Sequence, residues 1–171
     1  MIIDLLKIAI PALIVFLATY LLVSKMLNEQ ASKRSADITL NNQKITLPIR
    51  LQAYERIVLF LERVSPESLL LRTNQPGLTA QNLQANLISN IRAEWEHNLS
   101  QQIYLSSNAW ERVKSAKANV IKLISLCAEK VNPDDPAMML SKLILDSLVE
   151  LEHHPTAQAI ELLKKEVAEI F

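Results

Sequence analysis

A charge-free apolar run near the start of the chain restricts the possible folds more than any other feature. Residues 8–24 read IAIPALIVFLATYLLVS, seventeen consecutive positions without a charged side chain. At about 1.5 Å of rise per residue, a helix over residues 2–24 would cover the roughly 30 Å of bilayer hydrocarbon. Asp4 precedes the run and no small-x-small cleavage site follows it, which disfavours a cleaved signal peptide. We therefore predict a transmembrane anchor over residues 1–25.

Basic residues after this run predict the orientation of the anchor. Lys25, Lys33 and Arg34 follow it, whereas Lys7 and the amino terminus precede it. The positive-inside bias then places the amino terminus outside and the rest of the chain in the cytoplasm, at a bacterial inner membrane. The same three residues are candidates for contact with anionic lipid. An adaptor that binds such lipid or ribosomal RNA through its basic residues is therefore an alternative function.

The remaining composition favours an all-α domain. Half of the residues are hydrophobic and only one is a glycine, which disfavours turn-rich β structures. Eighteen basic and eighteen acidic residues cancel, so a nucleic acid is not the expected principal partner. The single cysteine, Cys127, excludes an internal disulfide and lies in an apolar helical pattern that predicts packing.

Capping residues and prolines divide the chain into helices. We expect a polar linker over residues 26–47, in which 38–47 could form a short hairpin, and a helical domain over 48–171. Helix starts are predicted at Pro48, after Ser65, at Thr79, at Ser106 or Ser107, after Asp135 at Pro136, and near Thr156. Apolar stripes at helical spacing comprise Leu51, Tyr54, Val58 and Leu61; Leu83, Leu87, Ile91, Trp95 and Leu99; and Trp110, Val113, Ala116, Val120, Ile124, Cys127 and Val131. About four longer helices joined by short corners predict an antiparallel bundle.

Two Glu-x-x-His pairs raise the hypothesis of a di-metal carboxylate enzyme. Glu94 precedes His97 by three residues, and Glu150 precedes His153 by the same spacing. A shared metal also needs an inward glutamate from each neighbouring helix, and the position facing Glu94 on the next helix falls near Ala118, where no acid occurs. We therefore assign no catalytic, metal-binding or cofactor-binding residue and expect a protein that is not an enzyme.

A polar band interrupts the helix predicted to begin at Thr79. It could be a surface that recognises a partner, a buried hydrogen-bond network that fixes helix register, or simply the solvent face. The residues of this band and its neighbourhood are Glu94, His97, Asn98, Gln101, Gln102, Tyr104 and Trp110.

Two distinctive stretches carry a family resemblance. Residues 45–63 (ITLPIRLQAYERIVLFLER) and 94–110 (EWEHNLSQQIYLSSNAW) resemble a family of short single-span membrane proteins of the Bacteroidota that has no assigned function. The resemblance implies a bacterial origin and an inner-membrane location, and it transfers no functional residue. Together these features predict a non-enzymatic accessory or scaffold protein whose cytoplasmic domain binds a protein partner or forms a homo-oligomer.

Overall fold

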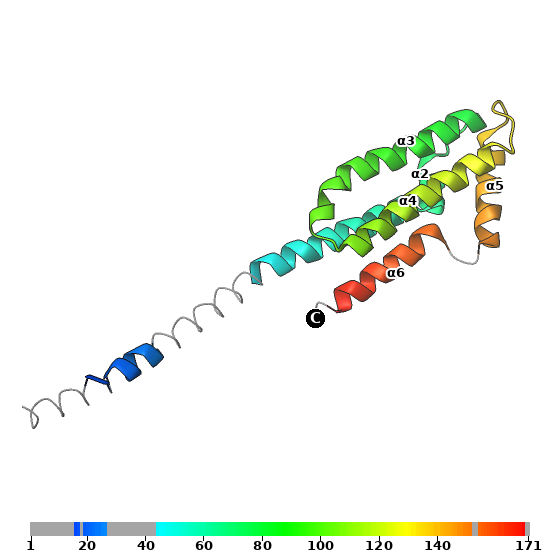
Figure 1. Cartoon of the computed structure of the whole chain (residues 1–171). Helices are drawn as coiled ribbons and strands as arrows, with labels where there is room; N and C mark the ends of the chain where they lie inside the picture. Colours follow the sequence, from blue (N-terminus) through cyan, green and yellow to red (C-terminus); the bar gives the residue numbers. More distant parts are fainter. Residues whose placement is uncertain (1–15, 18, 27–43, 152–153, 170–171) are drawn as a thin grey trace, which may run out of the picture. The chain divides into compact units, whose positions relative to one another are not determined.

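The described part of the chain is helical. The computed structural model describes residues 16–17, 19–26, 44–151 and 154–169 (Figure 1). Within these ranges the only β feature is an isolated bridge between Thr79 and Pro136, so the all-α prediction is confirmed. No helix in the described ranges is long and apolar enough to cross a membrane. The predicted anchor falls mostly on residues outside those ranges.

The helices follow the predicted order. A helix over residues 44–63 comes before six labelled elements. These are α2 (Pro66–Thr73), α3 (Ala80–Asn98), the 3-10 helix η1 (Leu99–Ile103), α4 (Ser107–Ala128), α5 (Ala137–Glu150) and α6 (Pro155–Ala168). The chain divides into two compact units, Met1–Leu47 and Pro48–Phe171.

One local prediction is wrong at the start of this series. Ile45 and Leu47 were assigned to a possible hairpin, but the helix already includes residue 44. Ile45 is 59% exposed, so its alternation with Leu47 does not mark the buried face of a strand. The other half of the suggested hairpin lies outside the described residues.

Three of the predicted caps are present. The side chains of Ser65, Thr79 and Ser106 accept hydrogen bonds from the backbone N–H groups of Ser68, Asn82 and Ala109, at 3.4, 3.2 and 3.0 Å. Each bond satisfies one of the N–H groups that lack a partner in the first turn of a helix.

The predicted Asp135 cap is not formed. Pro136 occupies the N-cap position of α5 and makes no capping hydrogen bond through its side chain. The Asp135 carboxylate instead accepts a bond from the N–H of Asn132 at 3.2 Å, closing its own turn.

The longer helices of the unit Pro48–Phe171 run antiparallel. In Figure 1, α3 and α4 lie side by side in opposite directions and α6 returns along α4, while α5 crosses the end of the bundle. The helical bundle predicted from the sequence is thus confirmed. Helix α5 differs from the other longer helices because it crosses one end of the bundle instead of running along it.

The core includes most of the predicted apolar stripes, but Leu99 at the end of one stripe is 42% exposed. Leu83, Leu87 and Ile91 are buried on α3, and the buried face of α4 runs from Val113 to Cys127. The helix over 44–63 differs in detail, because Leu51 and Val58 are only half-buried. Its fully buried side chains from Pro48 onward are Ala53, Tyr54, Ile57, Phe60 and Leu61.

A backbone junction joins the beginnings of α3 and α5. The N–H groups of Ala80 and Gln81 donate to carbonyl oxygens of the 133–135 loop at 2.8 and 3.1 Å, and Ala137 N–H donates to Leu78 oxygen at 2.9 Å. Gly77, with φ of +85°, turns the chain into this junction. The junction therefore fixes α5 across the end of the bundle.

Candidate functional site

The predicted polar band does not form one site. Its acidic member, Glu94, lies with one carboxylate oxygen 3.0 Å from Arg63 and 3.6 Å from Arg72. Arg72 also donates to the carbonyl oxygen of Arg63 at 2.6 Å. Glu94 thus links α3 to α2 and to the preceding helix, which is a structural role for a carboxylate that is only 19% exposed.

The other members of the band have separate environments. Asn98 is buried and donates to the Glu94 carbonyl at 2.8 Å, where the α-helical part of α3 ends. His97 and Gln102 are exposed, and half-buried Gln101 donates to the hydroxyl of Ser100 at 3.3 Å. The band therefore has a largely buried part, Glu94 and Asn98, which bonds to other groups of the domain, and a solvent-exposed part around His97.

Tyr104 and Trp110 take part in packing between helices. The backbone carbonyl of Tyr104 accepts from the Arg50 guanidinium at 3.4 Å. The Trp110 ring stacks on Trp95 of α3 with centroids 4.7 Å apart, and Phe60 meets the same ring at 5.7 Å. Stacking of this kind adds to the energy of burial.

A lysine side chain contacts the aromatic stack. The Lys117 ammonium lies 3.9 Å from the centroid of a Trp95 ring, close enough for a cation–π interaction. Burial, with a smaller contribution from Lys114, lowers the pKa of Lys117 below its usual value. The Trp95 and Trp110 rings thus contact each other and neighbouring side chains of the same domain.

A carboxylate on α6 joins three helices, a contact that sequence reasoning did not predict. The Glu166 carboxylate accepts from the Tyr54 hydroxyl at 2.9 Å and from the Ser106 hydroxyl at 2.7 Å. Burial first, and then the Glu166 carboxylate, raise the pKa of Tyr54 above its usual value. The partners lie 112 and 60 residues from Glu166 in the sequence, so no spacing rule could pair them.

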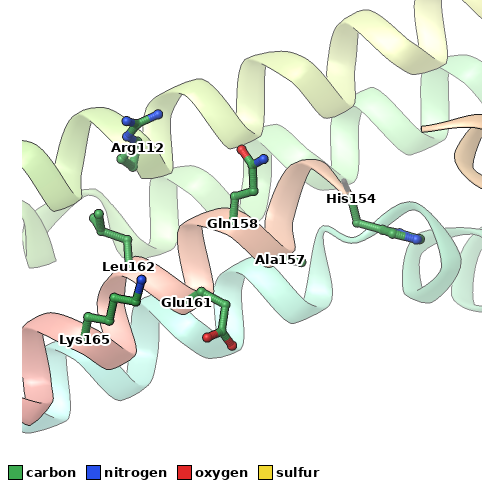
Figure 2. A pocket seen from close by; sticks show the side chains of 7 residues that line it. All are labelled: Arg112, His154, Ala157, Gln158, Glu161, Leu162 and Lys165. Atoms are coloured by element: carbon green, nitrogen blue, oxygen red, sulfur yellow. The ribbon is translucent and has the colours of Figure 1, made fainter. Parts of the chain in front are cut away.

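An open groove of about 550 Å³ lies between α4 and α6. Arg112 of α4 lines one side, and residues between His154 and Lys165 line the other. Figure 2 shows that the polar ends of its side chains fan apart instead of converging. Arg112 extends away from α6, while Glu161 and His154 point in other directions. Glu161 is also paired with Lys164 at 3.0 Å. A groove with diverging polar groups does not orient a reacting molecule.

A second groove, between α6 and the helix over 44–63, is almost wholly apolar. It has a volume of about 390 Å³. Leu51, Val58, Leu59, Leu163 and Val167 supply its apolar walls. Tyr54, Glu55 and Lys164 are the polar residues of its lining, and the Tyr54 hydroxyl is already bonded to Glu166.

The two most exposed large apolar side chains of the described residues outside the N-terminal unit lie on α2 and α5. Leu71 and Val149 are each 86% exposed, and Met138 and Leu145 are 65% and 42% exposed. We call these four residues the α2–α5 face. A hollow of about 490 Å³ separates α2 from α5 here, with Leu70 and Ser141 also in its walls.

Several predicted site residues lie elsewhere or outside the described ranges. Lys25 is exposed on the helix over 19–26, whereas Lys33, Arg34 and His153 are not among the described residues. Cys127 is buried, with its sulfur 3.5 Å from the Ser147 hydroxyl. In the described part of the chain, no three His, Cys, Asp or Glu residues group closely enough to hold a metal ion.

Comparison with known proteins places the chain in a family. A model described as a family of unknown function (DUF7935) matches residues 1–170. Because this match spans nearly the whole chain, the chain belongs to that family. No curated protein and no solved structure matches it. The resemblance to a family without an assigned function is confirmed at this level.

Proposed function

We propose that this member of the DUF7935 family is a non-enzymatic, membrane-anchored accessory or scaffold protein whose helical domain binds protein. The observation that carries the proposal is the α2–α5 face. Two of its apolar side chains, Leu71 and Val149, are 86% exposed, whereas the apolar side chains of the core are 0–7% exposed. Contiguous apolar surface beside a hollow marks an interaction site more often than scattered apolar residues do.

The charged groups of the domain support a binding role over a catalytic one. Glu94 is paired with Arg63 and Arg72, and Glu166 accepts bonds from two hydroxyl groups. Each carboxylate therefore stabilises contacts between helices. A general base would need instead to face a cavity with its substrate within hydrogen-bond reach.

The anchor is part of the same proposal. Residues 8–24 carry no charge, and Lys25, Lys33 and Arg34 follow them. These features support a single span at a bacterial inner membrane with the helical domain on the cytoplasmic side. An anchor would hold a small binding domain close to membrane-associated partners and raise its local concentration.

Affinity purification of the full-length chain from gently solubilised membranes tests the binding role. The wild type is compared with Leu71→Ser/Val149→Ser and with the control Ile103→Ser, which alters a side chain that is 73% exposed on η1. Protein that co-purifies with the wild type and the control, but not with the double variant, is the expected result. Identical recovery for all three proteins, or recovery of the free monomer alone, would contradict the proposal.

Membrane attachment is tested on intact and opened cells. We expect the chain to resist alkaline carbonate extraction, and we expect added protease to reach the helical domain only after the cells are opened. Release by carbonate, or digestion in intact cells, would contradict the anchor and its orientation. Salt-sensitive binding to anionic vesicles that needs Lys25, Lys33 and Arg34 would instead favour the lipid-facing adaptor.

A further inference from the structure

We propose that the α2–α5 face binds the same face of a second copy, so that the helical domain forms a two-fold symmetric dimer. The proposal rests on the binding function above and names the partner. A two-fold interface uses one surface patch on both copies, so the patch must complement itself in shape and in charge. The α2–α5 face meets both conditions.

Complementary shape comes from a hollow and protruding side chains on the same surface. The hollow between α2 and α5 is lined by Leu70, Leu71, Met138 and Leu145. Val149 lies four residues beyond Leu145 and is 86% exposed. Met138, Leu145 and Val149 are seven and four residues apart, so they share one side of α5. Two such sides laid antiparallel bring the protruding Val149 of each copy toward the hollow of the other.

Methionine suits this kind of contact. Met138 lies between two hollows, one against α2 and one against the Gly77 turn. A flexible thioether side chain adapts to a surface that is not perfectly matched. The backbone junction at Ala137 holds the start of α5 in place, so the residues of the face are already arranged before a partner binds.

Complementary charge comes from one acid and one base on opposite sides of the apolar surface. Glu67 forms part of the α2 wall of the hollow, and Lys142 is exposed on α5, next to Ser141 of the other wall. One oxygen of Glu67 meets His154 Nδ1 at 3.1 Å, whereas Lys142 has no ion pair in the described part of the chain. In a two-fold contact Glu67 of each copy faces the free Lys142 of the other, giving two ion pairs.

Charge reversal in the full-length chain tests this arrangement. Glu67→Lys alone and Lys142→Glu alone each place like charges at both contacts, so each variant is expected to self-associate about tenfold or more weakly than the wild type. An equimolar mixture of the two single variants restores opposite charges at both contacts. We therefore expect the mixture to form heterodimers with near wild-type affinity, which a purely local effect on stability would not produce.

The measurement is a concentration series by sedimentation in a mild detergent, with the two variants carrying different fluorophores. Glu96→Lys and Lys122→Glu alter exposed charges on α3 and α4 and serve as controls that leave association unchanged. Leu71→Ser/Val149→Ser should also dissociate the dimer. Circular dichroism checks that each variant is folded, as expected for exposed positions.

The outcomes separate this inference from the proposed function. A wild type that stays monomeric while another protein still needs the α2–α5 face for binding would overturn the dimer and leave the binding function standing. A dimer that survives every substitution of the face, or single variants that fail to pair when mixed, would also overturn it. If the wild type neither self-associates nor binds another protein through this face, both the dimer and the proposed binding function are overturned.

Discussion

Replacing Glu166 by alanine should destabilise the helical domain by about 2–3 kcal/mol. The carboxylate accepts from Tyr54 at 2.9 Å and from Ser106 at 2.7 Å, and these bonds hold α6 against α4 and the helix over 44–63. A hydrogen bond to a charged group contributes about 1.5–3 kcal/mol, so two bonds set an upper range of about 3–6 kcal/mol. Glu166 is only half-buried, and water that replaces part of this loss reduces the expected value.

Urea unfolding of the full-length chain, followed by far-ultraviolet circular dichroism, measures this free energy. Glu169→Ala, an exposed acid in the same helical turn region, is the matched control and should change stability by less than about 0.5 kcal/mol. Glu166→Gln keeps an acceptor and should cost less than the alanine variant. Ser106→Ala also removes the N-cap bond of α4, so a double-mutant cycle of Ser106→Ala with Glu166→Ala is needed to isolate the energy of the bond between the two side chains. A cost for Glu166→Ala no larger than that of the control, or a cycle without coupling, would refute the reasoning.

Three further predictions concern pH, backbone conformation and the core. The pKa of Tyr54 is raised above 10.0 in the folded state, so its contribution to stability is complete below about pH 10 and is lost as pH rises through the folded pKa. The urea midpoint of the wild type should therefore fall more steeply above pH 10 than that of Tyr54→Phe; equal slopes would contradict this. Gly77→Ala should cost about 1–2 kcal/mol in urea unfolding, because φ of +85° strains any side chain although the space is open; a neutral result would show that the turn relaxes. Leu87→Ala, at a position 1% exposed, should lower the unfolding free energy by about 2–5 kcal/mol, whereas Leu71→Ala at 86% exposure should change it by less than about 0.5 kcal/mol; similar losses would contradict the assignment of core and surface.

Local signals in the sequence predicted the helices and most of the core. Ser65, Thr79 and Ser106 were identified as caps because a hydroxyl before an apolar periodic run satisfies the first N–H groups of a helix. The stripe from Val113 to Cys127 was identified by its three- and four-residue spacing. Both signals act within one or two turns, so they are complete in the sequence.

Features that depend on distant parts of the chain could not be predicted. Nothing near Glu166 indicates that its carboxylate meets Tyr54 and Ser106, because the pairing follows from how α6 returns along α4. The α2–α5 face had the same limitation. The spacing of apolar residues indicates which side of each helix is apolar, but which side chains stay exposed depends on α5 crossing the end of the bundle.

Hydrogen bonds between backbone groups hold the start of α5 across the end of the bundle. The N–H groups of Ala80, Gln81 and Ala137 and their carbonyl partners exist in every residue type except for the missing donor of proline. Apart from Asp135, whose carboxylate closes the turn, side chains in the 132–136 turn can therefore change while the backbone bonds that hold α5 persist. We expect evolutionary variation to be broad in that turn and proline to be avoided at the three donor positions, so that surface chemistry can change without moving the scaffold that displays it.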